Sequence, residues 1–213
     1  LVAMYLRHLF MPAKADIHPL ESGTKTKHPF IFWVLGLFGL FAALSEGAAG
    51  DWGGVLARET FGATPFISTL PYIVFCTAMI IGRFSGDYLA HRFGASRIIM
   101  IGGIVSGSGL LLGLIVGGIP ALMIAWFLLG IGLSVVIPLM FSAAGTLASQ
   151  RYKGVIAPSQ AVAKVSGVSY FGFVLGPPMI GFLADQVQLR WALLLNVALS
   201  YLLIFAARYA KSA

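Results

Sequence analysis

Six apolar stretches follow one another between Phe30 and Ala207, with little polar sequence between them. Each is close to the ~20 residues that a helix needs to cross the ~30 Å hydrocarbon core of a bilayer. A membrane β-barrel would instead show short segments of alternating polarity. The stretches cover residues 30–50 (interrupted only by Glu46), 61–82, 98–118, 121–148, 165–184 and 191–207. This pattern predicts an all-α membrane protein with six transmembrane helices.

Composition and charge agree with this prediction. Hydrophobic residues make up 59% of the chain and charged residues 10%, whereas a soluble domain has ~25% charged residues. The net charge is +7, and its placement matters more than its size. Lysine and arginine gather before the first stretch, between the second and third, between the fourth and fifth, and after the sixth: Arg7, Lys14, Lys25, Lys27, Arg92, Arg97, Arg151, Lys153, Lys164, Arg208 and Lys211. Short loops rich in lysine and arginine stay cytoplasmic, so both ends of this segment are predicted to be cytoplasmic, and no nucleic-acid partner is expected.

The first 28 residues differ from the rest of the chain. Residues 1–10 are apolar but too short to span a bilayer, and residues 11–28 are polar and contain proline and lysine. The order of a secretory signal, with a basic start, an apolar centre and a small-residue cleavage site, is missing. We interpret residues 1–10 as the end of a preceding helix, residues 11–28 as a cytoplasmic linker and residues 29–213 as the transmembrane bundle. A chance apolar start is the alternative.

The most specific motif is GRFSGDYLAHRFGASR at residues 82–97, between the second and third stretches. It resembles the loop signature of the major facilitator superfamily and fits a tight cytoplasmic hinge. Gly94 can take the positive φ that reverses the chain, and Asp87 can accept from Arg92 or from a neighbouring helix N-terminus. The motif departs from the family at His91, where an acidic residue is common. The hinge residues that the resemblance implies are Gly86, Asp87, Arg92, Gly94 and Arg97.

A second block, GFVLGPPMIGFLAD at residues 172–185, looks like the fifth helix of that superfamily's C-terminal half. Residues 89–91 and 183–185 end two helices at corresponding positions, in agreement with a 3+3 inverted repeat. The resemblance covers residues 29–210 and implies half of a twelve-helix bundle. An N-terminal six-helix half of the same protein is then an expected partner, besides the lipid bilayer.

Prolines and glycines predict how the helices are shaped and packed. Proline removes a backbone donor and clashes with the preceding turn, so Pro138, Pro177 and Pro178 should kink or break their helices. Glycines recur four residues apart in the third and fifth stretches, which lets helix backbones approach closely. We interpret these rows as static packing.

The resemblance implies that the first, second, fourth and fifth helices line a solute cavity. On these helices Glu46 is the one ionisable side chain inside an otherwise uncharged span, in its outer third. Facing lipid, a carboxylate would cost at least ~2.5 kcal/mol, so it should face the bundle or a wet cavity, where its default function is proton relay. The alternative is an interfacial glutamate hydrated from outside. Further proton or substrate candidates are Asp51, more simply a loop charge, and Tyr72 and Tyr170, near the membrane centre; Asn196 is interpreted as structural.

Catalysis finds no support in the sequence. The zinc-protease pattern HExxH and the Walker lysine motif are missing, and the histidines have no metal-ligand spacing. We therefore expect no enzyme activity, no cofactor and no metal. The sequence predicts secondary active transport of a small solute by alternating access, coupled to protons, in a bacterial inner membrane. The alternatives are a non-transporting six-helix scaffold or receptor and a dimeric six-helix channel.

Overall fold

The computed structural model describes residues 29–210, and these form helices joined by short turns, with no strand. The elements are α2 (Phe30–Val55), the π-helix η1 (Leu56–Thr60), the 3-10 helix η2 (Ile67–Thr69), α3 (Leu70–Phe93), α4 (Ala95–Val116), α5 (Ile119–Leu133), α6 (Val136–Gln150), α7 (Pro158–Val187), α8 (Leu189–Ala192) and α9 (Leu194–Ala210). They make six spans that are long and apolar enough to cross a membrane. The predicted all-α fold with six transmembrane helices is confirmed, whereas the segments assigned to 1–10 and 11–28 lie outside the described residues.

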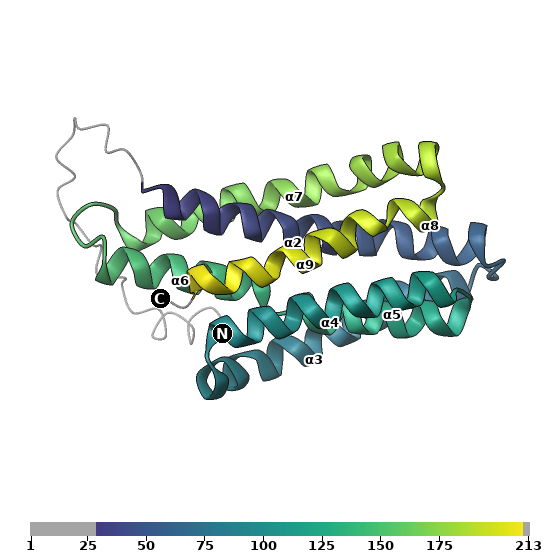
Figure 1. Cartoon of the computed structure of the whole chain (residues 1–213), viewed down its shortest axis with the longest axis horizontal. Helices are drawn as coiled ribbons and strands as arrows, with labels where there is room; N and C mark the ends of the chain where they lie inside the picture. The colour runs from purple at the N-terminus through teal and green to yellow at the C-terminus, as the bar shows by residue number, and fades with distance from the viewer. Residues whose placement is uncertain (1–28, 211–213) are drawn as a thin grey trace, which may run out of the picture.

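The six spans run alternately in opposite directions, so their connections gather at two ends (Figure 1). One end, which we call the basic end, holds the start of α2, the α3–α4 turn at Gly94, the 151–157 loop and the end of α9. The opposite end holds the 61–66 loop and the turn at Gly118. The clusters of lysine and arginine in the described residues therefore share one end of the bundle, as the sequence predicts.

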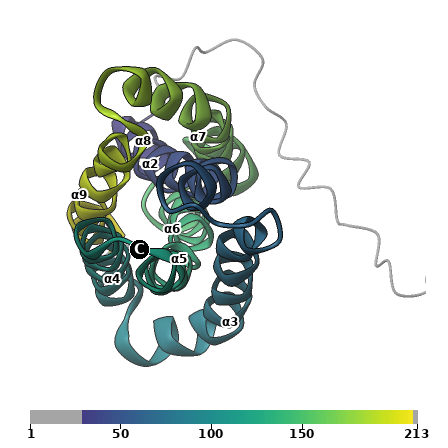
Figure 2. The ribbon, with the colours of Figure 1, turned by 90° about the vertical axis from the view of Figure 1, so that its right-hand side faces the viewer.

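Two helices form the rim of an open face. Viewed along the bundle, α3 and α7 lie on one side, α4 and α9 on the other, and α2, α5 and α6 between them (Figure 2). Only 28% of the most apolar window of the α3 span and 22% of that of the α7 span are buried, against 44–61% in the other four spans. Much of α3 and α7 is thus left uncovered by the described residues.

The longest helix contact joins α2 to α7, and glycines make it possible. A Cβ on Gly172 would meet the backbone oxygen of Leu40 and, at 2.8 Å, the backbone nitrogen of Leu44. A Cβ on Gly176 would lie 2.7 Å from the Leu44 oxygen. Because lipid gives no hydrophobic drive for association, this backbone contact replaces the side-chain packing of a soluble core.

We expect Gly172→Ala to lower the thermal stability of the purified protein. The added methyl group meets backbone atoms that cannot rotate away, and overpacking of this kind costs ~1–3 kcal/mol. Gly167→Ala is the matched control on the same helix, because its Cβ would meet nothing within 4 Å. Thermal denaturation in detergent measures both variants, and equal melting temperatures would contradict the close α2–α7 contact.

The fourth span is interrupted at Ser134 and Val135, between α5 and α6. Pro138 is the third residue of α6, where a backbone N–H has no helical partner in any case, so proline costs little there. At the interruption the Ser134 hydroxyl donates to the Ile131 oxygen over 2.8 Å. The break thus precedes the proline by a turn.

Of the predicted kink or break, the fifth span shows no break. Helix α7 runs unbroken through Pro177 and Pro178. Proline leaves carbonyls of the preceding turn without donors, but α2 lies close to that turn: a Cβ on Gly47 would be 3.5 Å from the Phe173 oxygen. The Trp52 indole N–H also donates to the Pro177 oxygen over 3.2 Å. Packing against α2 therefore maintains the helix across both prolines.

Several helices extend beyond their apolar stretches. Helix α3 does not end at Gly82 but continues to Phe93, where Gly94, with φ 86°, ends it. The first span likewise continues past Gly50 to Thr60. Asp51, interpreted from the sequence as a loop charge, therefore lies on α2, which is a correction. The end of α3 at Phe93 lies close to residues 89–91, where the motif comparison ends this helix.

Candidate functional site

Three cavities follow one another along α2 and α3. The basic-end cavity, of about 680 Å³, lies between α3 and α6, and the central cavity, of about 700 Å³, lies between α2, α3 and Phe173 of α7. The third, of about 710 Å³, opens toward η1 and η2 at the opposite end. The central and third cavities share Gly50, Asp51 and Tyr72. Of the described residues, Arg83 alone lines both the basic-end and the central cavity.

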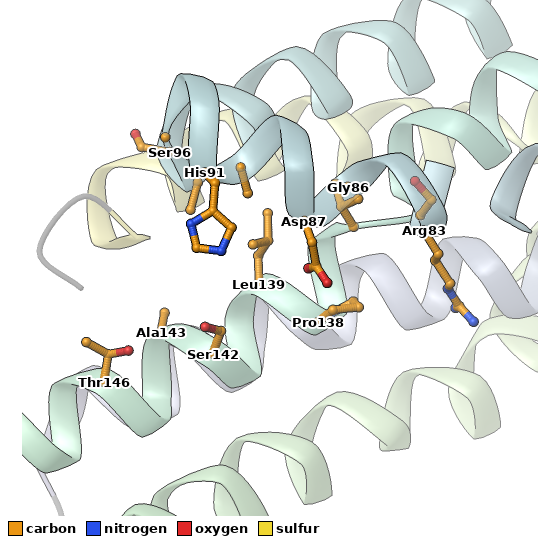
Figure 3. Close-up of a pocket in the computed structure, with 15 residues that line it drawn as sticks. Arg83, Gly86, Asp87, His91, Ser96, Pro138, Leu139, Ser142, Ala143 and Thr146 are labelled. Atoms are coloured by element: carbon orange, nitrogen blue, oxygen red, sulfur yellow. The ribbon is translucent and has the colours of Figure 1, made fainter. Parts of the chain in front are cut away.

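An ion pair lies where the first two cavities meet. Arg83 Nη2 on α3 is 3.7 Å from Glu46 Oε2 on α2, and this is the one salt bridge among the described residues. Both residues lie near the middle of their spans, which cover Phe30–Thr60 and Ile67–Phe93. Along the helix, Glu46 thus lies closer to the middle of the span than to its end. In Figure 3 the Arg83 side chain extends from α3 toward α2, away from His91.

The two side chains of this pair differ in their solvent exposure. The Glu46 side chain is 8% exposed and that of Arg83 54% exposed. Glu46 Oε1 is buried and has no hydrogen-bond partner in the described part of the chain. The carboxylate is thus enclosed by α2 and its neighbours, whereas the guanidinium reaches the cavity.

Aromatic rings lie on the α7 side of the central cavity. Tyr170 on α7 lies between Phe141 of α6, with ring centroids 6.0 Å apart, and Phe173, at 6.1 Å. Tyr170 is 54% exposed and does not line any of the three cavities. Phe173 does line the central cavity. The α7 side therefore offers flat apolar surface and one hydroxyl.

Asp51 and Tyr72 lie together between the central and third cavities. Tyr72 is in the first turn of α3, closer to the helix end than its central place in the apolar stretch indicates. Its ring lies 3.5 Å from a Cβ built on Gly50 of α2. Of the four predicted candidates, Glu46, Asp51 and Tyr72 therefore line one cavity, and Tyr170 lies apart from them.

Three of the five predicted hinge residues line the basic-end cavity, together with His91 (Figure 3). Gly86, Asp87 and Gly94 line it, and the Asp87 and His91 side chains point from α3 toward α6. Arg92 does not pair with Asp87. Its guanidinium contacts its own helix, donating to the Tyr88 hydroxyl over 2.7 Å. Asp87 has no ion pair within residues 29–210, and Arg97 lies in the first turn of α4.

Arg83 is the site residue that sequence reasoning does not single out. It is part of the GRFSGDYLAHRFGASR motif, but the apolar stretch ends at Gly82, directly before it. A basic residue directly after an apolar run, with ten more residues of helix to follow, could have indicated a buried partner. On α9, Asn196 and Ser200 are fully buried without partners in the described residues and line none of the three cavities.

The described residues contain no cluster of three histidine, cysteine, aspartate or glutamate side chains that could hold a metal ion. What the site offers is one buried carboxylate, one half-exposed guanidinium, and hydroxyl and aromatic groups around a cavity. These groups can bind a charged or hydrogen-bonding solute and can carry a proton. Such an arrangement suits recognition of a small molecule at mid-membrane depth.

Comparison with known proteins agrees with this arrangement. Residues 30–212 match the family model described as Major Facilitator Superfamily. The chain is 32% identical over 182 residues to an uncharacterized MFS-type transporter of Yersinia pestis, a match that covers 80% of this chain and 46% of that protein. It is 26% identical over 200 residues to the membrane protein MosC of Rhizobium meliloti, covering 94% and 47%. It is also 32% identical over 159 residues to an uncharacterized transporter of Sinorhizobium fredii, covering 74% and 40%. The chain therefore spans less than half the length of these relatives, and it belongs to the major facilitator superfamily of membrane transporters.

Proposed function

We propose that this chain is the C-terminal half of a secondary transporter that moves a small solute by alternating access, coupled to protons. The observation that carries the proposal is the position of Arg83, which lines both the basic-end and the central cavity. Alternating access needs a binding group that can be reached from each side of the membrane in turn. An arginine at the meeting point of two cavities, at mid-span, meets this need.

The open face supports a second six-helix half. Helices α3 and α7 are the least covered of the six spans, and the central cavity lies between α2, α3 and α7. An N-terminal half of the same protein, placed on this face, would enclose the cavity and leave α4 and α9 toward lipid (Figure 2). The 3+3 inverted repeat within this half belongs to the same proposal.

Proton coupling is assigned to Glu46. It is a buried carboxylate in the middle of a span, and a carboxylate at that depth is costly unless it is paired or protonated. The pair with Arg83 stabilises the charged form, and the partnerless Oε1 leaves an oxygen where a proton can reside. Transport, with Glu46 exchanging a proton, is therefore the proposed activity in place of catalysis.

A dye-based assay tests this function and identifies the class of solute at the same time. The full-length protein that contains this chain is reconstituted into proteoliposomes with a pH-sensitive dye inside. Sugars, amines, small carboxylates and amino acids are then added in turn. We expect one class to change the internal pH in the wild type. Solute counterflow without a pH change would contradict proton coupling, and flux without counterflow would favour the channel alternative.

We expect the basic end of the bundle to face the cytoplasm of the bacterial inner membrane. Phe66→Cys, in the opposite-end loop, should then react with an impermeant maleimide added to intact cells, and Val155→Cys, in the basic-end loop, should not. Both side chains are exposed, at 75% and 48%. Phe66 is preferred to Gly118, whose φ of 82° would strain a cysteine. The reverse labelling pattern would remove the predicted orientation.

A further inference from the structure

The central cavity presents one exposed cationic group to a solute, the Arg83 guanidinium. The Arg83 side chain is 54% exposed, and the Glu46 carboxylate behind it is 8% exposed. A guanidinium has five N–H donors, and the single salt bridge of Arg83 spans 3.7 Å, which is longer than a hydrogen bond. A molecule that enters the cavity therefore meets unused donors before it meets the glutamate.

The other ionisable groups around this pair are few. On α3, Tyr72 and Cys76 line the central cavity, and on α2 Asp51 does so. Asp51 lies more than a turn from Glu46, where the central cavity joins the third one. From α7 the lining residue is Phe173, which carries no charge. Arg83 is the one cation in this lining, and it lies beside the glutamate.

We propose, resting on the function above, that the solute carries a carboxylate and that this group takes the place of Glu46 at the Arg83 guanidinium. Arginine binds carboxylates through two parallel N–H···O bonds, a geometry that the present 3.7 Å contact does not reach. Glu46 and the solute compete for one guanidinium. Binding of a proton to Glu46 removes the competitor, so each solute anion enters with one proton.

The exchange leaves the charge of the site unchanged. In the empty site Arg83 carries one positive charge and Glu46 one negative charge, and their sum is zero. In the loaded site the same arginine, a neutral protonated Glu46 and one solute carboxylate again sum to zero. Asp51, the other carboxylate of the lining, takes no part in the exchange. Because added charge is costly inside a bilayer, an exchange that adds none is suited to reorientation across the membrane.

Cys76 gives a readout that does not depend on transport. It is the one cysteine of this chain, it is partly buried and it lines the central cavity. The full-length protein is purified in detergent and treated with N-ethylmaleimide, and mass spectrometry follows the labelling of the Cys76 peptide. The probes are small hydroxy and aromatic monocarboxylates together with their primary amides and the matching amines.

We expect carboxylates to slow labelling and amides and amines to leave it unchanged. Protection should strengthen as the pH falls, because protonated Glu46 no longer competes. Glu46→Gln should bind the carboxylate independently of pH. Arg83→Gln should raise the apparent dissociation constant of the carboxylate by about 10- to 100-fold, the effect of losing a charge-assisted hydrogen bond. Arg83→Lys should keep part of the affinity. Arg151→Gln, an exposed arginine outside the three cavities, is the matched control.

The double variant Glu46→Gln with Arg83→Gln removes both charges together and guards against misfolding from an unpaired buried charge. Protection by amides or amines, no protection by any carboxylate in Glu46→Gln, or full protection in Arg83→Gln would each overturn the anion site. Carboxylate protection without any pH change in the proteoliposome assay would overturn proton coupling and leave the anion site. Internal pH changes caused by amines or neutral sugars would overturn the anion site and leave proton coupling.

Discussion

Glu46→Gln is expected to abolish solute accumulation driven by a pH gradient while sparing solute exchange. Glutamine imitates the protonated carboxyl group, so the solute can still bind and cross, but no proton travels with it. One pH unit is worth ~1.4 kcal/mol, or about tenfold accumulation for one proton per solute. The variant should therefore bring the internal concentration only to the external one, a loss of about tenfold for each unit of imposed gradient.

Uptake and counterflow in proteoliposomes, with and without an imposed pH gradient, measure this loss for the solute that the dye assay identifies. Asp185→Asn is the control, since Asp185 is an exposed carboxylate near the end of α7 and lines none of the three cavities. If Glu46→Gln accumulates solute normally, the coupling proton is carried elsewhere, in the remainder of the full-length protein. Loss of counterflow as well would instead indicate that Glu46 is needed for binding.

Asp87→Asn should reduce the initial uptake rate by about 10-fold or more without affecting membrane insertion. The Asp87 carboxylate points into the basic-end cavity and has no ion pair within the described residues (Figure 3). A charge kept at a hinge without a local partner acts on the balance between conformations, through a contact made in only one of them. A charge-assisted hydrogen bond of ~1.5–3 kcal/mol accounts for an effect of this size.

Arg92→Ala is the informative comparison. The sequence allows Asp87 to accept from Arg92 or from a helix N-terminus, but the Arg92 guanidinium contacts Tyr88 and Phe93 of its own helix. Exposed contacts within one helix are worth only ~0.2–0.5 kcal/mol, so the uptake rate should change by about twofold at most. Uptake rates and membrane insertion are measured for both variants. Normal uptake by a well-inserted Asp87→Asn variant would remove the hinge function from this residue.

The sequence predicts the number of spans, the turn at Gly94 and the intramembrane position of Glu46 because each depends on local chemistry. An apolar run reports how much chain crosses hydrocarbon, and it does not report where the helix ends. The helices continue past their apolar stretches, which places Asp51 on α2 and Arg83 on α3. Helix ends outside the membrane are set by turn residues such as Gly94. The apolar pattern of the sequence therefore indicates little about where these ends lie.

The pairing of Glu46 with Arg83 could not be predicted in the same way. Two side chains on different helices meet only if both helices have the right rotation and depth. In a soluble helix the polar face reports that rotation, but α2 and α3 are apolar around most of their circumference, so no such face exists. For the same reason Tyr72, placed at mid-membrane from its apolar stretch, lies in the first turn of α3.

The interruption of the fourth span has a mechanical consequence. Where backbone hydrogen bonds are missing, a helix loses bending stiffness, and Ser134 and Val135 form such a joint. Helix α3 lies directly on it: a Cβ at Gly82 would meet the Ser134 side chain, and one at Gly86 would meet Val135. Because neither glycine has a side chain between the two helices, we expect bending at the joint to displace the turn of α3 that follows Gly82. That turn begins with Arg83, so bending at the joint should also shift the ion pair with Glu46.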